Sequence, residues 1–164
     1  MMNYPLLSKK MSYKIKTVWR KSTYVSSTIF MLIGVVAVGT LAWFNHLNGV
    51  WIWLLGSYFL VGLIIFVFSM LLIPYRYKFY RYEITAEDLA FQKGFIFRSL
   101  TYVPMNRIQH VETEQGPFLR QENLMEIVIH TAATSHHIAG LDVQEAMDLR
   151  QQIIELIKVV KEDA

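Results

Sequence analysis

The chain has 164 residues, enough for about one ordinary domain, and 54% of them are hydrophobic. It contains no cysteine, which excludes disulfides, a thiolate nucleophile and cysteine metal sites. The formal net charge of +3 is unevenly spread. Residues 1–82 carry nine Lys and Arg and no acid, whereas residues 83–164 carry seven Lys and Arg and thirteen Asp and Glu. The basic charge therefore lies outside the carboxyl-terminal half, and binding of nucleic acid, which needs a basic face on a folded domain, is not expected.

Residues 1–23 form a basic segment, and two long apolar stretches follow it. Residues 24–44 and 51–73 contain no charged side chain. Each reaches the length of about 20 residues that a helix needs to cross a hydrocarbon core of roughly 30 Å. Residues 45–50, with the sequence NHLNGV, are a short turn between them. We therefore predict a transmembrane helical hairpin.

The positions of the cations predict the orientation of this hairpin. Nine of them flank the two spans, and the short turn has none: Lys9, Lys10, Lys14, Lys16, Arg20, Lys21, Arg76, Lys78 and Arg81. Cytoplasmic flanks are enriched in Lys and Arg, so both termini should face the cytoplasm at a plasma membrane. The same cations are the ones available to contact anionic lipid. A secretory signal is the alternative, but its apolar region has only about 7–15 residues.

From residue 74 onward the hydrophobic pattern becomes that of a small α+β domain, residues 74–164. Apolar residues alternate with polar ones around residues 80–85, 89–91 and 125–130, which predicts antiparallel strands. Residues 95–103 are apolar on both faces and predict a central strand, which Pro104 ends.

A single amphipathic helix should end the chain. Asp142 and Glu145 have the spacing of a capping box, and apolar residues then recur at helical intervals over residues 142–161. We expect a small antiparallel barrel or sandwich capped by this helix.

The polar stretch MNRIQHVETEQGPF, residues 105–118, holds the candidate contact residues. Ile108 and Val111 are three apart, so the strand either bulges there or begins only near His110. Arg107 and Gln109 can each make several directed hydrogen bonds, either to a partner or to neighbouring carbonyls and acids of the domain. We single out four candidate partner contacts: Arg107, Gln109, Gln115 and Arg120.

Catalytic or metal chemistry has weak support. The pair His136-His137, with His130 or Glu126 as extra ligands, is the one metal candidate. Adjacent residues of a strand point to opposite faces, so polar loop histidines are the better interpretation, and we expect no metal site and no cofactor. Glutamates at 112 and 114 are interpreted as a solvated stripe. We expect no enzyme, although a hydrolase built on these histidines is an alternative with no identifiable substrate.

Residues 80–156 resemble the bacterial pleckstrin-homology (PH)-like domains of the membrane-anchored type. The resemblance rests on YEIT, on IHT and AGLD before the helix, and above all on one ordered set: Pro104, Arg107-Ile108-Gln109, Val111 and Gln115-Gly116-Pro117. Paired membrane spans commonly precede the domain in that family. The resemblance implies a PH-like fold.

We therefore interpret the chain as a non-enzymatic, membrane-anchored interaction module at the cytoplasmic face of the membrane. The partner that the resemblance implies is a larger membrane protein that carries several PH-like domains, in an envelope-related complex. A homo-oligomer is a further possibility, although neither span has a Gly-x-x-x-Gly face. The alternative function is a lipid or small-ligand sensor. Against it, the turn at residues 85–88 is acidic, where headgroup-binding PH domains of eukaryotes carry Lys and Arg.

Overall fold

The structure, a computed structural model, describes residues 7–44, 48–94 and 99–162. The chain divides into two compact units. Trp19–Ile73 form a helical hairpin, and Met1–Val18 together with Pro74–Ala164 form an α+β domain.

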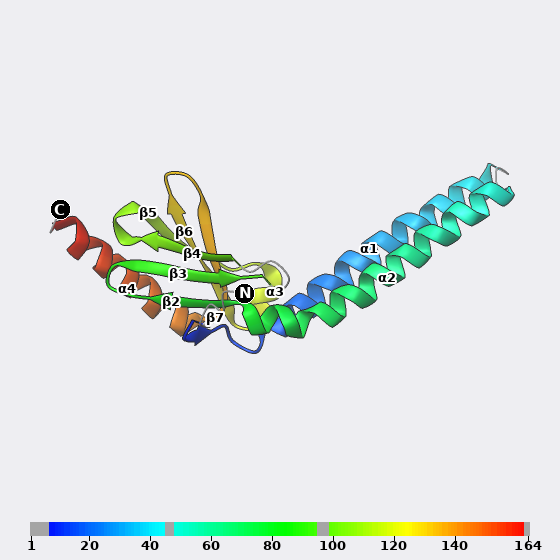
Figure 1. Ribbon diagram of the computed structural model, residues 1–164. Coiled ribbons are helices and arrows are strands. Elements are labelled where there is room, and N and C mark those ends of the chain that lie inside the picture. The colour runs from blue at the N-terminus through cyan, green and yellow to red at the C-terminus, as the bar shows by residue number, and fades with distance from the viewer. Residues whose placement is uncertain (1–6, 45–47, 95–98, 163–164) are drawn as a thin grey trace, which may run out of the picture. The chain divides into compact units, whose positions relative to one another are not determined.

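The hairpin consists of α1 (Ile15–Trp43) and α2 (Gly49–Phe79), which run side by side (Figure 1). Both are long and apolar enough to cross a membrane. They extend further than the predicted spans, because α1 starts before residue 24 and α2 continues beyond residue 73. Of the predicted turn, residues 45–47 lie outside the described residues. Asn48 caps α2, since its side-chain oxygen accepts a hydrogen bond from the Trp51 N–H at 3.3 Å.

Two glycines allow the helices of the hairpin to approach closely. The Phe30 and Tyr58 rings stack across the hairpin at a centroid distance of 4.3 Å, and the Tyr58 hydroxyl donates to the Phe30 carbonyl at 2.6 Å. A Cβ placed on Gly34 would lie 2.6 Å from the Tyr58 ring, and one on Gly62 would lie 2.7 Å from the Phe30 ring. Small residues at these positions therefore let the aromatic rings pack against the opposite backbone.

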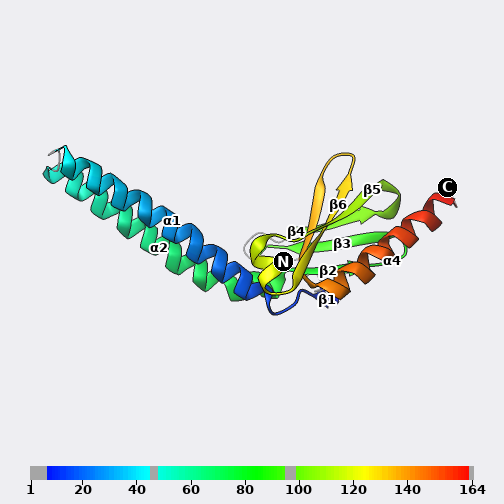
Figure 2. The ribbon, with the colours of Figure 1, turned by 180° about the vertical axis from the view of Figure 1, so that it is seen from behind.

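The domain contains two antiparallel sheets (Figures 1 and 2). The first has the order β1-β2-β3-β4: β1 (Lys9–Lys10), β2 (Arg81–Ile84), β3 (Asp88–Lys93) and β4 (Ser99–Pro104). The second has the order β5-β6-β7: β5 (Ile108–Glu114), β6 (Leu124–Thr131) and β7 (Ser135–Asp142). The helices are η1 (Met105–Arg107), α3 (Pro117–Gln121) and α4 (Val143–Glu162).

One hydrophobic core joins both sheets and the last helix. The strands contribute alternate apolar residues, and α4 contributes the apolar side of its amphipathic pattern through Ala146, Leu149 and Ile153. Tyr82 is 1% exposed within this core, and its hydroxyl donates to Glu145 Oε1 at 3.1 Å. Burial, followed by the Glu145 carboxylate, raises the pKa of Tyr82 well above its usual range. The expected domain, antiparallel sheets capped by a carboxyl-terminal helix, is confirmed.

The amino-terminal segment packs on the domain, which sequence analysis did not predict when it treated residues 1–23 as a separate part. Strand β1 pairs with β2, and the Leu7 N–H donates to the Oε1 of Gln92 at 3.3 Å. Gln92 is 2% exposed, because this segment covers the outer face of β3. A polar side chain buried in this way needs the hydrogen bond that the segment supplies.

A second contact holds the start of α1 against β7. The Ser12 N–H donates to the Gly140 carbonyl at 2.8 Å, and Ile15 is 1% exposed. Gly140 has a φ of +78°, and a Cβ at this position would lie 2.8 Å from the Ile15 side chain. Both the backbone conformation and the close approach therefore require glycine here.

Other predictions need correction. The strand predicted as central within residues 95–103 is β4, which lies at the end of its sheet in the described part of the chain; residues 95–98 lie outside that part. Pro104 does end it.

The register shifts between Ile108 and His110, so the bulge is confirmed. Gly116 has an ordinary φ of −67° and precedes α3, a short helix that begins with Pro117 and was not predicted.

Replacing Gly34 with valine should destabilise the hairpin, because the new side chain overlaps the Tyr58 ring. Overpacking of this kind costs about 1–3 kcal/mol. The measurement is the midpoint of thermal unfolding of the full chain in detergent. Gly39→Val is the matched control, since nothing lies within 4 Å of a Cβ at that position. Equal midpoints for the two variants would contradict the packing.

Gly140→Ala should destabilise the domain by roughly 1–3 kcal/mol, because alanine must adopt a positive φ and also collides with Ile15. Denaturant unfolding of the full chain measures this loss. Gly116→Ala is the control, with an ordinary φ and open space around its Cβ. A loss of equal size in both variants would show that the contact with Ile15 is unimportant.

Candidate functional site

A cavity of about 630 Å³ lies where the two sheets meet at their edge strands. Strand β4 is last in the first sheet and β5 is first in the second, among the strands that the structure describes. The lining comes from β4, η1, the start of β5 and the turn between β6 and β7: Thr101–Pro104, Asn106–Gln109, Thr131–Thr134 and His136. It holds two of the four predicted contact residues, Arg107 and Gln109.

The local sequence explains why polar side chains face this cavity. Pro104 ends β4, and the chain turns through η1 before β5 begins. Met105 and Ile108 are almost fully buried and anchor both sides of the turn in the core. The intervening residue Arg107 is therefore left exposed. The bulge after Ile108 leaves Gln109 exposed as well.

Arg107 and Gln109 are available for contacts outside the domain. Within the described part of the chain, neither side chain makes a hydrogen bond or an ion pair. Sequence analysis had left open whether they tie the strand connection to neighbouring groups. Tyr102 on β4 is 57% exposed and lines the same cavity, a residue that sequence analysis missed. Exposed Tyr and Arg are the side chains most enriched at interface hot spots.

The other two predicted contact residues lie elsewhere. Gln115 is at the opposite end of β5 from Gln109, about 20 Å away at roughly 3.4 Å per residue. Its side-chain Nε2 donates to the Leu124 carbonyl at 2.9 Å, which ties the end of β5 to the start of β6. Arg120 is exposed at the end of α3. The four residues therefore do not form one surface, and Gln115 has a structural contact inside the domain.

The two adjacent histidines belong to β7, so their interpretation as loop residues is wrong. His136 stacks on Phe91 with a centroid distance of 5.3 Å and an interplanar angle of 6°. His137 points to the other face, where its Nδ1 lies 2.9 Å from Glu126 Oε1. Opposite faces were predicted for strand neighbours, and the pair does not meet at one site. Burial, then Lys93 and His137, lower the pKa of His136.

Several flanking cations take part in contacts of the domain. Lys14 Nζ lies 2.9 Å from Asp142 Oδ1, and Lys16 Nζ lies 4.2 Å from the centre of the Tyr13 ring. Arg81 donates to a carbonyl of the amino-terminal segment at 3.1 Å. The other members of the set are Lys9 and Lys10 in β1, Arg20 and Lys21 in α1, and Arg76 and Lys78 in α2. Contact of this set with lipid stays a prediction.

Comparison with known proteins identifies relatives over most of the chain. The Bacterial PH domain family matches residues 21–157, a range that includes α2 and most of α1. The chain is 40% identical over 151 residues to the UPF0699 transmembrane protein YdbS of Bacillus subtilis (strain 168), and the alignment covers 89% of this chain and 90% of that relative. No solved structure matches. Neither the family description nor the relative's name indicates an enzymatic activity.

The lowered pKa of His136 predicts a pH-dependent stability. The unfolded chain takes up a proton near the ordinary pKa of about 6.5, before the folded chain does. The contribution of His136 is therefore fully present above about pH 6.5 and is lost as the pH falls through the folded pKa. Thermal unfolding of the full chain at several pH values should show a smaller loss in His136→Gln than in the original protein. Parallel pH profiles would exclude this residue as a cause.

Proposed function

Because the chain belongs to the bacterial PH domain family and is a transmembrane protein with two candidate spans, we propose that it is a membrane-anchored docking module. In this proposal the hairpin holds the domain at the membrane, and the rim of the cavity binds another membrane protein. The module performs no chemistry of its own. The observation that carries the proposal is the exposed pair Arg107 and Gln109 beside Tyr102 at this cavity, whose side chains have no hydrogen-bond or ion-pair partner in the described part of the chain.

The proposed orientation places the domain and both termini in the cytoplasm. It is supported by the nine cations that flank the spans and by the absence of any Lys or Arg from residues 45–50. With this orientation, the domain faces the cytoplasmic surface of a plasma membrane.

The shape of the site suits a peptide segment of a protein partner. The outer edge of β4 has no neighbouring strand among the described residues, so its backbone groups can pair with an added strand. Tyr102 supplies a large, rigid aromatic surface beside that edge, and Arg107 and Gln109 supply donors for side chains or carbonyls. Backbone pairing would give affinity, and the three side chains would give specificity.

The membrane anchor makes a weak interface sufficient. Two proteins in one membrane have already lost much of the translational freedom that association costs in solution, so their effective concentration is high. The proposed partner is a larger membrane protein with several PH-like domains, in an envelope-related complex. That choice rests on the family resemblance.

Ligand sensing is a second candidate, and the size of the cavity favours it. Small-molecule sites measure about 300–1,000 Å³, and this cavity has about 630 Å³. Arg107 is the one permanently charged side chain among its described lining residues, so an anionic group of a lipid or metabolite would meet it first. A ligand of this kind would occupy the same residues that the docking proposal uses.

Photocrosslinking in the native membrane separates these possibilities. A photoactivatable residue replaces Tyr102 in the tagged full chain, and the crosslinked products are purified in mild detergent and identified. We expect one larger membrane protein as the main product, because Tyr102 lies at the proposed contact. The same residue at position 147, where Met147 is 44% exposed on α4, is the control for non-specific capture.

Substitution then tests the two polar residues. Arg107→Ala combined with Gln109→Ala should abolish the product, whereas Arg120→Ala should leave it unchanged, because Arg120 is an exposed arginine on α3 that does not line the cavity. A crosslink only to lipid or to a small molecule would replace docking with ligand sensing. A crosslink only between copies of the chain would replace it with self-association.

A further inference from the structure

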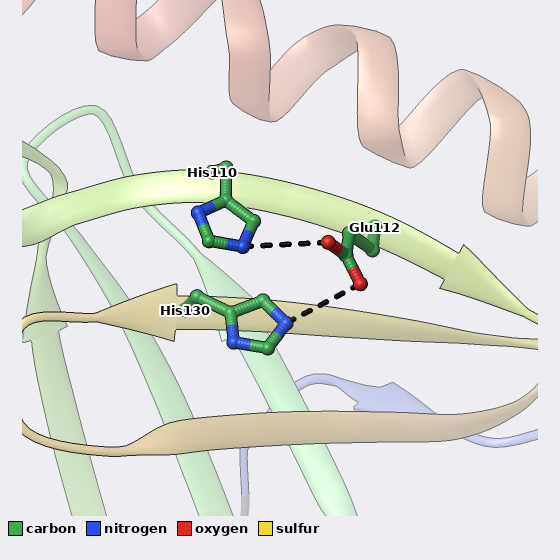
Figure 3. A group of neighbouring side chains, drawn as sticks. All are labelled: His110, Glu112 and His130. Carbon is green, nitrogen blue, oxygen red and sulfur yellow. Dashed lines mark ion pairs between the residues drawn. The ribbon is translucent and has the colours of Figure 1, made fainter.

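The outer face of the second sheet carries a cluster of metal-ligating side chains, of which only His130 belonged to the metal candidate considered from the sequence. Figure 3 shows His110 and Glu112 on β5 and His130 on β6 with their side chains gathered on one face. Residues 110 and 112 share a face because they are two apart on one strand, and His110 is the direct cross-strand partner of His130. Their ligand atoms all lie within 4.8 Å of one another.

Two distances within this cluster are close to those between ligands of one small cation. His110 Nε2 lies 3.4 Å from Glu112 Oε1, and His130 Nε2 lies 3.6 Å from Glu112 Oε2. These separations are within ion-pair distance but exceed the roughly 2.7–3.2 Å of good N–H···O hydrogen bonds. Bonds of about 2.0–2.1 Å from tetrahedral Zn²⁺ to nitrogen and oxygen place neighbouring ligand atoms about 3.4 Å apart. The two separations therefore leave room for an ion between each imidazole and the carboxylate.

His130 has an unsatisfied nitrogen at this position. Its Nε2 atom is buried and has no hydrogen-bond partner among the described residues. Its other ring nitrogen, Nδ1, lies 2.9 Å from the Ser135 hydroxyl oxygen. When Nδ1–H donates to Ser135, the lone pair of Nε2 faces Glu112 and is free to bind a metal. Partners of this kind orient metal-binding histidines and raise their basicity.

The surroundings determine what an ion meets at this cluster. Val128 is the cross-strand partner of Glu112 and is 2% exposed, so an apolar side chain lies beside the carboxylate. The side chains of His110 and Glu112 are 54% and 53% exposed, so an ion reaches them directly from solvent. The His110 and His130 rings are stacked at a centroid distance of 4.3 Å and an interplanar angle of 17°, so one ring has to rotate before both nitrogen lone pairs point at a shared ion.

We propose that His110, Glu112 and His130 form a binding site for a divalent transition-metal ion of the Zn²⁺ class. Imidazole and carboxylate ligands suit such ions, and three protein ligands leave one position for water. This inference is independent of the docking proposal, because none of the three residues lines the cavity at β4 and β5. The metal candidate considered from the sequence, His136-His137 with His130 or Glu126, shares only His130 with this site.

Zinc titration of the full chain tests the site. The protein is purified in detergent with an affinity tag that contains no histidine, treated with a chelator, and titrated with ZnSO₄ by calorimetry. We expect about one high-affinity Zn²⁺ per chain. His130→Ala and Glu112→Gln should each lower the affinity by more than the roughly 10–100-fold that loss of an orienting partner costs, and Ser135→Ala should lower it within that range.

His137→Ala is the matched control, since His137 is a histidine of the neighbouring strand β7 and is paired with Glu126 outside the cluster. Its affinity for Zn²⁺ should equal that of the original protein. Thermal unfolding without metal shows whether each variant is folded. Added Zn²⁺ should raise the midpoint most in the original protein and in His137→Ala, less in Ser135→Ala, and least in His130→Ala and Glu112→Gln. The proposal is wrong if the original protein lacks stoichiometric binding, or if Glu112→Gln binds Zn²⁺ unchanged.

Discussion

The contact between Ile15 and Gly140 is the constraint on which the organisation of this chain depends. Ile15 is the first residue of α1 and is also 1% exposed within the domain. Its side chain fits only because residue 140 has no Cβ. The amino-terminal segment continues this packing through β1 and through the hydrogen bond to Gln92. The domain is thus assembled from residues that precede the hairpin and residues that follow it. The basic residues that precede the hairpin are therefore part of a folded surface.

The connection from β4 of the first sheet to β5 of the second sheet determines where the candidate site lies. Met105 and Ile108 hold the connection in the core, so the backbone between them must turn at the surface. That turn leaves Arg107 exposed between two strand edges. This cavity is bordered by strand edges and by polar side chains without partners among the described residues, so it offers hydrogen-bonding groups to a ligand.

Strand alternation places His110, Glu112 and His130 together on the outer face of the second sheet. Ile127 and Ile129 face the core, so His130 must face outward, next to the outward residues of β5. Direct cross-strand pairing then brings His110 and His130 together, and the two-residue spacing adds Glu112. Sequence analysis had interpreted the glutamate as part of a solvated stripe, because the pairing partner of β5 was unknown.

The sequence by itself determined the parts of this protein that depend on local pattern. Charge-free stretches of sufficient length specify the two long helices, period-two alternation specifies most strands, and helical periodicity after Asp142 specifies α4. The order of residues from Pro104 to Pro117, together with YEIT, IHT and AGLD, was enough to recognise a resemblance to the family and therefore to expect the fold. Each of these signals lies within a few consecutive residues, where geometry relates neighbours along one element.

Tertiary structure decided which distant residues meet. The packing of residues 7–18 on the domain, the edge position of β4 and the pairing of His110 with His130 each depend on strand order and register. These relations join segments far apart in the chain, and a change of register by one residue would move every side chain of a strand to the other face. Local periodicity contains no information about strand order or register. Both are determined by how the whole hydrophobic core is buried.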